Sequence, residues 1–294
     1  MHINGVEIED TFAEGFKMWG ARLIITALNA EWAHTAAQVT TGFATSVIGC
    51  GCEAGIEGHL APDQTPDGRP GVSVLFFVSS SKAMEKLLLL RVGQGIMTCP
   101  TTACYNGLES DVRCKVGGGL RYFGDGFQAS KLLDGRRLWR IPVMEGEFVI
   151  DESFGMAKGV GGGNFLVLGD SVEATLAATE AAVAAMSQVP AVILPFPGGI
   201  VRSGSKVGSR YKFLSASTNT AYCPTLRAQV DSDLPEGVNS VLEVVIDGLS
   251  EEAVRQAMRV GIEAACRPGI VRITAGNYGG KLGQFQIHLR ELCS

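Results

Sequence analysis

A single carboxyl group stands inside an apolar run near the end of the chain. Residues 241–246 read VLEVVI, a composition typical of a strand, and the third residue of this run is Glu243. Because side chains alternate between the two faces of a strand, Glu243 shares its face with Val241 and Val245. The carboxyl is therefore either exposed at a sheet edge or desolvated with a raised pKa. In the second case it can serve as a general acid or a neutral hydrogen-bond donor near neutral pH.

A glycine- and serine-rich segment, residues 195–210, places three cationic side chains at four-residue spacing. The candidate substrate-binding residues of this segment are Gly198, Gly199, Arg202, Ser205, Lys206 and Arg210. Cations set among glycines and serines can bind carboxylates or phosphates. A solvated basic edge is the alternative interpretation.

Three other segments combine glycine with polar or charged side chains, as expected where backbone approaches a ligand closely. They are residues 65–71, 159–164 and 275–283, and all three are predicted to be loops. Their candidate substrate-binding residues are Arg69, Asn164, Asn277, Tyr278 and Lys281. Turns between strands are the alternative. None of these segments has the spacing of a Walker P-loop.

The cysteines and histidines do not form a metal-ligand pattern. Cys50 and Cys52 are too close together for a C-x2-C zinc knuckle, and four residues separate Cys99 from Cys104. These thiols could together build a four-cysteine site, but no histidine supports it, so the pattern favours buried reduced thiols and no metal is predicted. His34, on a predicted helix, is interpreted as a surface or core histidine rather than a catalytic base.

Composition excludes several classes of protein. The 294 residues carry 25 basic and 30 acidic side chains, and the net charge of −5 argues against a nucleic-acid partner. The hydrophobic content of 46% allows a sizeable core. The apolar stretches are far shorter than the ~20 residues of a membrane span, and the start MHINGVE lacks a signal-peptide pattern. We therefore expect a cytoplasmic protein without a membrane partner.

The elements that must position these residues repeat along the chain. An apolar run, a polar break with a capping residue and a helical stretch occur four times, and two such βαβ halves make one ferredoxin-like sandwich. The predicted helices cover 30–42, 82–92, 172–186 and 251–266, and the predicted strands cover 22–28, 46–49, 72–78, 165–168, 191–194, 241–246 and 270–273. The predicted fold class is α+β, with two ferredoxin-like (split βαβ) lobes at 1–145 and 146–294. A hairpin of residues 121–126 and 137–142 is expected just before the boundary. A doubly wound parallel sheet fits less well, because the long glycine-rich inserts suit antiparallel excursions.

Several long motifs, in order along the chain, resemble the formylmethanofuran:tetrahydromethanopterin formyltransferase family. They are residues 3–14 (INGVEIEDTFAE), 65–71 (TPDGRPG), 140–148 (RIPVMEGEF), 195–208 and 274–283 (TAGNYGGKLG). The resemblance covers essentially the whole chain. It implies two ferredoxin-like lobes, which agrees with the four repeated units.

The resemblance also implies an activity in one-carbon metabolism. A formyl group would move between the amine of a methanofuran-type carrier and N5 of a tetrahydromethanopterin-type pterin, with both carriers as substrates and no metal or prosthetic group. Glu243 matches the glutamate held to be catalytic in the family. Because methanofuran-type carriers bear glutamate carboxylates, Arg202, Lys206, Arg210 and Lys281 gain a target.

Two assemblies follow from the resemblance. Family members form homotetramers, but Cys50 and Cys52 depart from the pattern of the methanogen members. This departure is more similar to the bacterial one-carbon branch, in which the similar protein is a subunit of a formyltransferase/hydrolase complex. Two other functions stay open: a non-catalytic carrier-binding or scaffold subunit, and a hydrolase that releases formate, for which the scattered histidines offer no metal-activated water.

Overall fold

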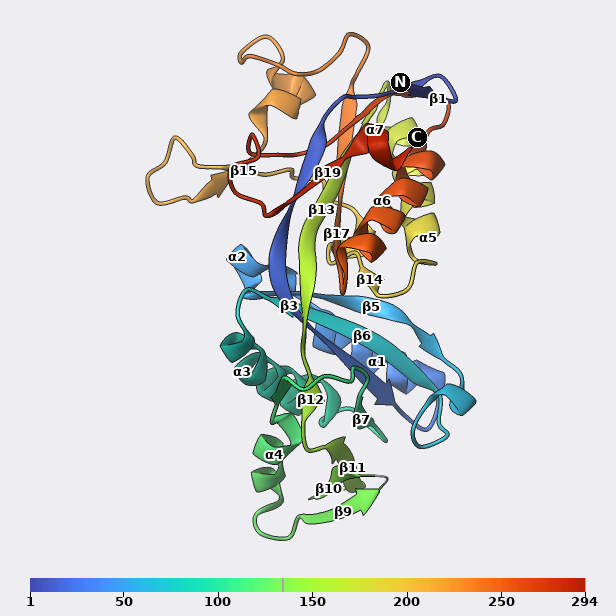
Figure 1. Cartoon of the computed structure of the whole chain (residues 1–294), viewed down its shortest axis with the longest axis vertical. Coiled ribbons are helices and arrows are strands. Elements are labelled where there is room, and N and C mark those ends of the chain that lie inside the picture. The colour runs from blue at the N-terminus through green and yellow to red at the C-terminus, as the bar shows by residue number, and fades with distance from the viewer. Residues whose placement is uncertain (134, 294) are drawn as a thin grey trace. The chain divides into compact units, whose positions relative to one another are not determined.

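The computed structural model describes residues 1–133 and 135–293, which form two compact units (Figure 1). The central unit consists of Lys17–Val160 with Gly248–Ser250, and the terminal unit consists of Met1–Phe16, Gly161–Asp247 and the chain from Glu251 onward. Two long strands, β3 (Phe12–Thr26) and β13 (Ala157–Gly169), contribute residues to both units. The inner sheet of the central unit contains β3 and that of the terminal unit contains β13.

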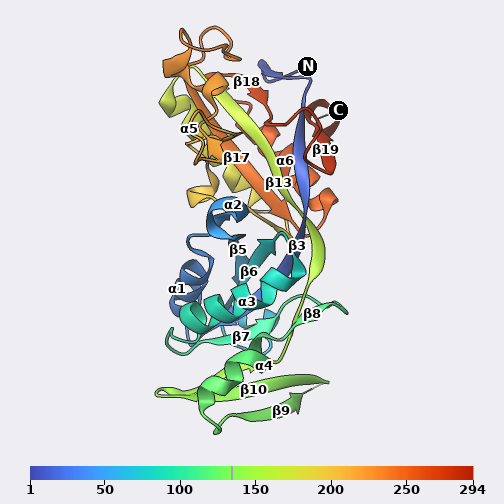
Figure 2. The same cartoon turned by 90° about the vertical axis from the view of Figure 1, so that its left-hand side faces the viewer.

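The central unit is a mixed sheet packed against helices (Figure 2). Its inner strands lie in the order β7-β3-β6-β5, each antiparallel to its neighbours, and β11, β10 and β9 extend the sheet beyond β7. The strands are β4 (Thr45–Ser46), β5 (Cys52–Leu60), β6 (Gly71–Val78), β7 (Ala103–Asn106), β8 (Arg113–Cys114), β9 (Ala129–Leu133), β10 (Arg136–Val143), β11 (Gly146–Asp151) and β12 (Phe154–Gly155). The helices are α1 (Ala30–Thr41), α2 (Val47–Cys50), α3 (Ser81–Arg91) and α4 (Val116–Leu120).

Local chemistry explains the main elements of the central unit. Asn29 caps α1 by accepting a hydrogen bond from the Trp32 amide at 3.0 Å, and the small buried side chains of α1 let the helix lie close to the sheet. Every residue of β6 is buried, as expected for an apolar, β-branched strand covered on both faces. Met84 and Leu88 of α3 join the same core.

The terminal unit repeats the arrangement with different strands. Its inner strands lie in the order β14-β17-β13-β18, and β2 and β1 continue the sheet beyond β18. The strands are β1 (His2–Ile3), β2 (Val6–Ile8), β14 (Val192–Ile193), β15 (Lys206–Val207), β16 (Ala216–Ser217), β17 (Ser240–Gly248), β18 (Ile270–Thr274) and β19 (Phe285–His288). The helices are α5 (Val172–Met186), α6 (Glu251–Ala265) and α7 (Leu289–Leu292). Ser171 caps α5 through the Ala174 amide.

Helices α5 and α6 pack directly on each other and on this sheet. An added Cβ at Gly261 of α6 would lie 2.6 Å from the Met186 sulfur of α5. An added Cβ at Gly163 of β13 would lie 2.4 Å from Val254 of α6. Both glycines are needed because neighbouring side chains fill the space that a Cβ would take.

The predicted helices are confirmed to within one or two residues, and the coarse class, mixed sheet with packed helices, is confirmed as well. Three local predictions were wrong. Residues 159–164, predicted as a loop, lie inside β13, where Gly159 and Gly163 leave room for neighbouring groups that a Cβ would displace. Residues 47–50 form the short helix α2 rather than a strand. Residues 121–124 form a 3₁₀ turn, and β10 pairs instead with β9 and β11.

Candidate active site

Glu243 lines a cavity of about 1030 Å³ in the terminal unit. The walls come from β17, the start of α5, the segment from Phe196 to Gly204, and residues 218–225. Apolar side chains such as Leu166 and Leu176 share these walls with polar ones such as Thr218 and Asn219. The predicted strand carboxyl therefore faces a space large enough for part of a substrate.

Strand alternation decides which way Glu243 points. Val244 and Ile246 are fully buried, while Glu243 and Val245 are half-buried on the other face of β17. No ion pair or hydrogen bond in the described part of the chain reaches the Glu243 carboxyl, and burial alone raises its pKa to about 7. Because β17 is paired on both sides and burial raises the pKa of Glu243, the structure favours the second of the two interpretations left open by the sequence.

The basic segment is joined to the active strand at this residue. Val201 and Glu243 exchange two backbone hydrogen bonds, of 2.8 and 3.0 Å, in an isolated antiparallel bridge. The bridge fixes Arg202, the next residue, in the cavity wall with an exposed side chain. A cation and a neutral carboxyl group are thereby brought to the same cavity.

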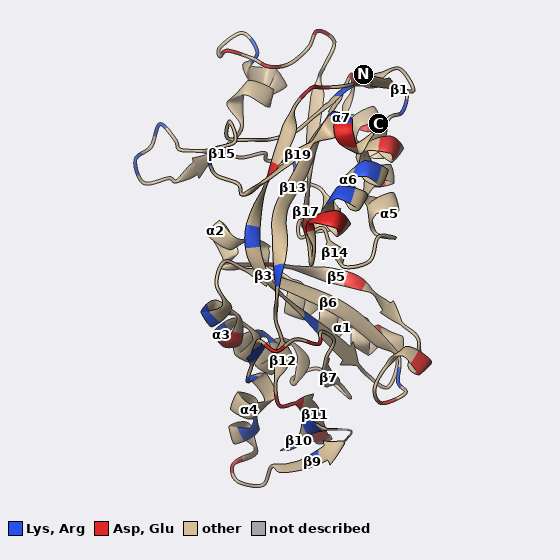
Figure 3. Cartoon of the chain, viewed as in Figure 1, with Lys and Arg blue, Asp and Glu red and all other residues tan. Residues whose placement is uncertain are grey.

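The remaining candidates of residues 195–210 differ in their surroundings. Lys206 on β15 donates from Nζ to Thr220 Oγ1 at 2.7 Å, whereas Ser205 and Arg210 are exposed and do not line the cavity. Gly198 and Gly199 close a 3₁₀ turn with φ of 61° and 78°, a conformation that favours glycine. In Figure 3, the loop that leaves β15 carries Lys and Arg residues, which are drawn in blue.

Residues 275–283 form a loop after β18, as predicted. Asn164 holds its start: Gly276 donates to Asn164 Oδ1 at 2.6 Å, and Asn164 Nδ2 donates to the Gly276 carbonyl at 3.1 Å. Asn277 Nδ2 donates to the Phe12 carbonyl at 3.1 Å. Lys281 is exposed. The two asparagines therefore engage the protein's own backbone and fix the loop to β13 and β3.

Glu14 organises the same loop and was missed from the sequence. Its side chain is 1% exposed, and its two oxygens accept hydrogen bonds from the four backbone amides of Tyr278, Gly280, Leu282 and Gly283, at 2.5 to 3.0 Å. Burial would raise the pKa of this carboxyl, but the four amide bonds outweigh burial and hold the pKa below its usual range. The signal was available, because Glu14 is a carboxyl within the strand run 12–16 just as Glu243 is within 241–246.

Tyr278 connects this loop with the Glu243 site. Burial raises the pKa of its phenol, and the negative charges of Glu243 and Glu14 raise it further, so the hydroxyl stays protonated. Its ring lies 6.4 Å from the ring of Phe16. Tyr222, a second tyrosine, lines the Glu243 cavity and, unlike Tyr278, was not predicted.

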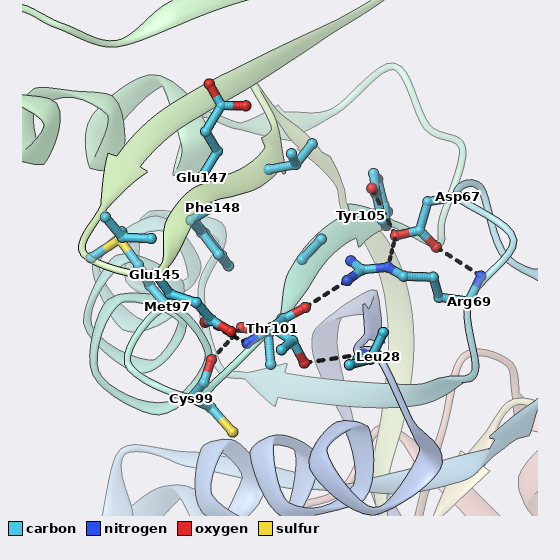
Figure 4. Close-up of a pocket in the computed structure, with 14 residues that line it drawn as sticks. Leu28, Asp67, Arg69, Met97, Cys99, Thr101, Tyr105, Glu145, Glu147 and Phe148 are labelled. Atoms are coloured by element: carbon cyan, nitrogen blue, oxygen red, sulfur yellow. Dashed lines mark hydrogen bonds and ion pairs between the residues drawn. The ribbon is translucent and has the colours of Figure 1, made fainter.

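Arg69 lies in the central unit, beside a cavity of about 460 Å³ (Figure 4). Its Nε donates to Asp67 Oδ2 at 2.8 Å, its Nη1 to the Thr101 carbonyl at 2.6 Å, and its Nη2 to Thr26 Oγ1 at 3.0 Å. The Tyr105 hydroxyl donates to the same Asp67 oxygen at 3.1 Å. Arg69 thus organises a hydrogen-bonded wall of this cavity.

Within residues 1–133 and 135–293, no group of three or more His, Cys, Asp or Glu side chains is placed to hold a metal ion. Nor does any helix within these ranges have the length and apolar character to cross a bilayer. Cys50 accepts or donates a hydrogen bond with Thr45, and Cys52 is buried.

Chemically, the Glu243 cavity suits transfer of an acyl-type group. A carboxyl with a pKa of about 7 can donate a proton near neutral pH, and Arg202 can bind an anionic part of a substrate. The apolar walls and the desolvated carboxyl favour charge stabilisation by direct hydrogen bonds rather than by water.

Comparison with known proteins covers nearly the whole chain. A family model described as formylmethanofuran-tetrahydromethanopterin formyltransferase matches residues 1–143, and a model described as FTR, proximal lobe, matches residues 146–292. A formylmethanofuran–tetrahydromethanopterin formyltransferase of Methylococcus capsulatus is 59% identical over 296 residues, with 99% of each chain covered. A component of the formyltransferase/hydrolase complex of Methylorubrum extorquens is 53% identical over 300 residues, with 99% of this chain and 96% of that protein covered.

Two solved structures are also similar. A chain of the formyltransferase/hydrolase complex from Methylorubrum extorquens, solved in complex with methylofuran, matches with a TM-score of 0.97 and 52% identity, covering 100% of this chain and 99% of that one. The formylmethanofuran:tetrahydromethanopterin formyltransferase from Methanosarcina barkeri matches with a TM-score of 0.95 and 49% identity, covering 99% and 100%.

Proposed function

The chain belongs to the formylmethanofuran–tetrahydromethanopterin formyltransferase family, and we propose that it moves a formyl group between a methanofuran-type amine and N5 of a tetrahydromethanopterin-type pterin. The carriers are substrates of one-carbon metabolism, and no prosthetic group takes part. The observation that carries the assignment to a site is Glu243, an uncompensated carboxyl with a pKa raised by burial to about 7, in the wall of a cavity that also holds Arg202.

The reaction needs both a hydrogen-bond donor and a proton. The pterin N5 attacks the formyl carbon of the carrier amide, so an N–C bond forms and the carbonyl oxygen becomes negative. Collapse of this intermediate breaks the original C–N bond, and the leaving amine takes a proton. The neutral Glu243 carboxyl can donate to the oxyanion or supply that proton, and a donor aimed at the oxyanion contributes about 3 kcal/mol. The proton lost by N5 restores the acid.

Carrier binding is assigned to the cationic and glycine-rich segments. Arg202 in the cavity wall and the exposed Arg210 and Lys281 are proposed to bind carrier carboxylates. Lys206 is proposed to contribute to carrier binding indirectly, because its bond to Thr220 holds the β15–β16 hairpin in place. The other proposed carrier-binding residues are Arg69, Asn164, Gly198, Gly199, Ser205, Asn277 and Tyr278. Holding both carriers in one site supplies the positional part of the acceleration.

The fold supports the finer architecture that the sequence suggested. In the central unit, β3-α1-β5-β6-α3-β7 follow one another along the chain and lie as β7-β3-β6-β5. In the terminal unit, β13-α5-β14-β17-α6-β18 lie as β14-β17-β13-β18. Both orders support two ferredoxin-like, split βαβ lobes. The division after residue 145 stays a prediction.

The proposed assembly is a homotetramer or a subunit of a formyltransferase/hydrolase complex, in the cytoplasm. The second assembly is supported by the component of the Methylorubrum extorquens complex that is 53% identical to this chain. Mass measurement of the protein purified from its native source separates the two. A mass equal to four copies supports the homotetramer, whereas additional chains support the complex.

The activity is tested with the purified chain alone, given a formylated methanofuran-type carrier and a tetrahydromethanopterin-type pterin. We expect formylated pterin to accumulate without any partner chain or added metal. Carrier binding without turnover would instead support the non-catalytic carrier-binding subunit. Free formate in place of formylated pterin would support a hydrolase.

A further inference from the structure

The carboxylate of Glu14 is held entirely by main-chain amides. Oε1 accepts from Tyr278 at 2.7 Å and from Gly280 at 2.6 Å, and Oε2 accepts from Leu282 at 3.0 Å and from Gly283 at 2.5 Å. All four donors belong to one loop, residues 277–283, while Glu14 belongs to β3, far away in the sequence. We call these four amides and the carboxylate the Glu14 cradle.

The conformation of the loop matches the anion that it surrounds. Gly279 and Gly280 follow each other with φ of 70° and 73°, which turns successive amides toward one point. Converging amides form a concave site that favours a negative charge. An added Cβ at Gly283 would lie 2.7 Å from the Glu14 Cβ and 2.8 Å from the Gly15 carbonyl, so the loop lies directly on β3.

The loop carries Tyr278 at the edge of the cradle. The Tyr278 amide is one of the four donors, and the preceding residue, Asn277, is bonded to the Phe12 carbonyl. These two bonds fix the backbone from which the Tyr278 side chain leaves. Its ring packs near Phe16, and the residue is 38% exposed, so the phenol is reachable by a ligand.

Tyr278 and Glu243 lie in the same compact unit, and a negative charge on Glu243 raises the pKa of the Tyr278 phenol. The strands connect them: Leu166 of β13, which lines the Glu243 cavity, pairs with Thr274 of β18, and the loop that bears Tyr278 begins directly after β18. A neutral phenol near a neutral carboxyl gives two donors for one reaction centre.

We propose that Glu14 is a positioning residue of the transfer site, whose carboxylate folds the 277–283 loop so that the Tyr278 hydroxyl stands beside Glu243 and donates a hydrogen bond to the oxyanion of the tetrahedral intermediate. The inference rests on the proposed formyl transfer. It divides the work between two groups. Tyr278 stabilises the negative oxygen without losing its proton, and Glu243 gives its proton to the leaving amine.

The test is a double-mutant cycle on kcat with Glu14→Gln and Tyr278→Phe. Tyr278→Phe removes one oxyanion donor and should lower kcat by about 10²-fold. Glu14→Gln should lower kcat by a similar factor, because it replaces two acceptor positions of the cradle by an amide NH₂. The double variant should be no slower than the slower single variant, since both changes remove the same interaction. If the two effects multiply, to about 10⁴-fold, Glu14 does not act through Tyr278 and the inference is wrong.

Hydrogen exchange of the peptide that covers residues 276–284 gives a readout independent of activity. Exchange should be faster in Glu14→Gln and unchanged in Tyr278→Phe, because only the first variant opens the cradle. Unchanged protection in Glu14→Gln would overturn the positioning role. If Glu14→Gln does not fold, Gly283→Ala replaces it, since the added Cβ pushes the loop away while keeping the carboxylate.

Glu7→Gln is the matched control. It removes a half-exposed carboxylate on the nearby strand β2, whose partner is Arg272 at 2.8 Å, and should leave both kcat and loop exchange unchanged. Wild-type protein that does not transfer formyl groups would refute the proposed function. The hydrogen-exchange result would still decide whether Glu14 holds the 277–283 loop. Active wild-type protein with multiplicative losses would refute only the role of Glu14.

Discussion

Glu243 and Glu14 are two carboxyl groups of one compact unit with opposite surroundings. Glu14 is buried and Glu243 is half-buried, and burial by itself raises the pKa of a carboxyl. Glu14 meets four backbone amides, which reverse the effect of burial and hold its pKa below the usual range. Glu243 meets no such donors, and its pKa rises to about 7. Burial together with donors yields a permanent anion that shapes a loop, and burial without them yields an acid that can exchange its proton.

The largest expected effect concerns Glu243, the carboxyl that receives no hydrogen bond from the backbone amides that the structure describes. Glu243→Gln keeps the shape and a hydrogen-bond donor but cannot transfer a proton, so kcat should fall about 10²- to 10⁴-fold if proton transfer limits the reaction. In wild-type protein, kcat should also fall as the pH rises through about 7, because the neutral acid is lost. Steady-state kinetics at saturating carriers measure both.

Glu263→Gln on α6 is a suitable control, because this carboxylate is exposed and pairs with Arg259 on the same helix. Near-full activity of Glu243→Ala would remove Glu243 from the mechanism. It would also show that a buried carboxyl without donors need not be reactive.

The second prediction concerns Glu14, the carboxylate that accepts hydrogen bonds from four backbone amides. Glu14→Gln should lower the free energy of unfolding at pH 7 by about 3 kcal/mol or more, since each hydrogen bond to a charged group contributes about 1.5–3 kcal/mol. Because the folded-state pKa is lowered, the stabilisation is fully present above the ordinary pKa of a glutamate and is lost as the pH falls through the folded-state pKa. Urea unfolding at several pH values should show the difference between wild type and variant shrinking in acid. A difference that stays constant would contradict the role of the charge.

Stability should respond to pH with the opposite sign at Glu243. Its raised pKa means that the folded protein binds more protons between pH 4.5 and about 7, so stability falls as the pH rises through this window. Glu243→Gln should match wild type at pH 4 and exceed it by about 1–2 kcal/mol above pH 7, with a discount for partial exposure. Equal pH dependence in both proteins would show that the carboxyl is solvated.

The smallest effects are expected in the basic segment that the Glu243 bridge fixes in place. Arg202→Ala and Arg210→Ala should raise KM for the carrier several-fold each, about 1 kcal/mol, make binding less sensitive to salt, and leave kcat nearly unchanged. Lys206→Ala should act differently, because its ammonium is bonded to Thr220 and its loss loosens the hairpin. An unchanged KM in all three variants would show that the segment is a solvated basic edge that does not bind the carrier.

Periodicity and capping residues were sufficient to predict the helices and the strand of Glu243, because these signals are local. The family was predicted from motif order and is confirmed by two family models. Composition misled at residues 159–164, since a glycine that opens a turn and a glycine that admits a neighbouring side chain look alike in sequence. Glu14 was missed although it is a carboxyl within a strand run, because the amides that hold it lie more than 260 residues away and its role could not be inferred locally.

The pairing of early and late strands has a consequence during synthesis. Strand β2 pairs with β18, and β3 pairs with β19. The partners of Glu7 and Phe12, which are Arg272 and His288, are synthesised 272 − 7 = 265 and 288 − 12 = 276 residues later. At about 5–20 residues per second, the delay at the ribosome is on the order of tens of seconds. The central unit, almost continuous in sequence, can assemble meanwhile. A chain interrupted before β18 therefore presents the unpaired edge of an early strand, the kind of surface on which nascent chains aggregate and chaperones bind.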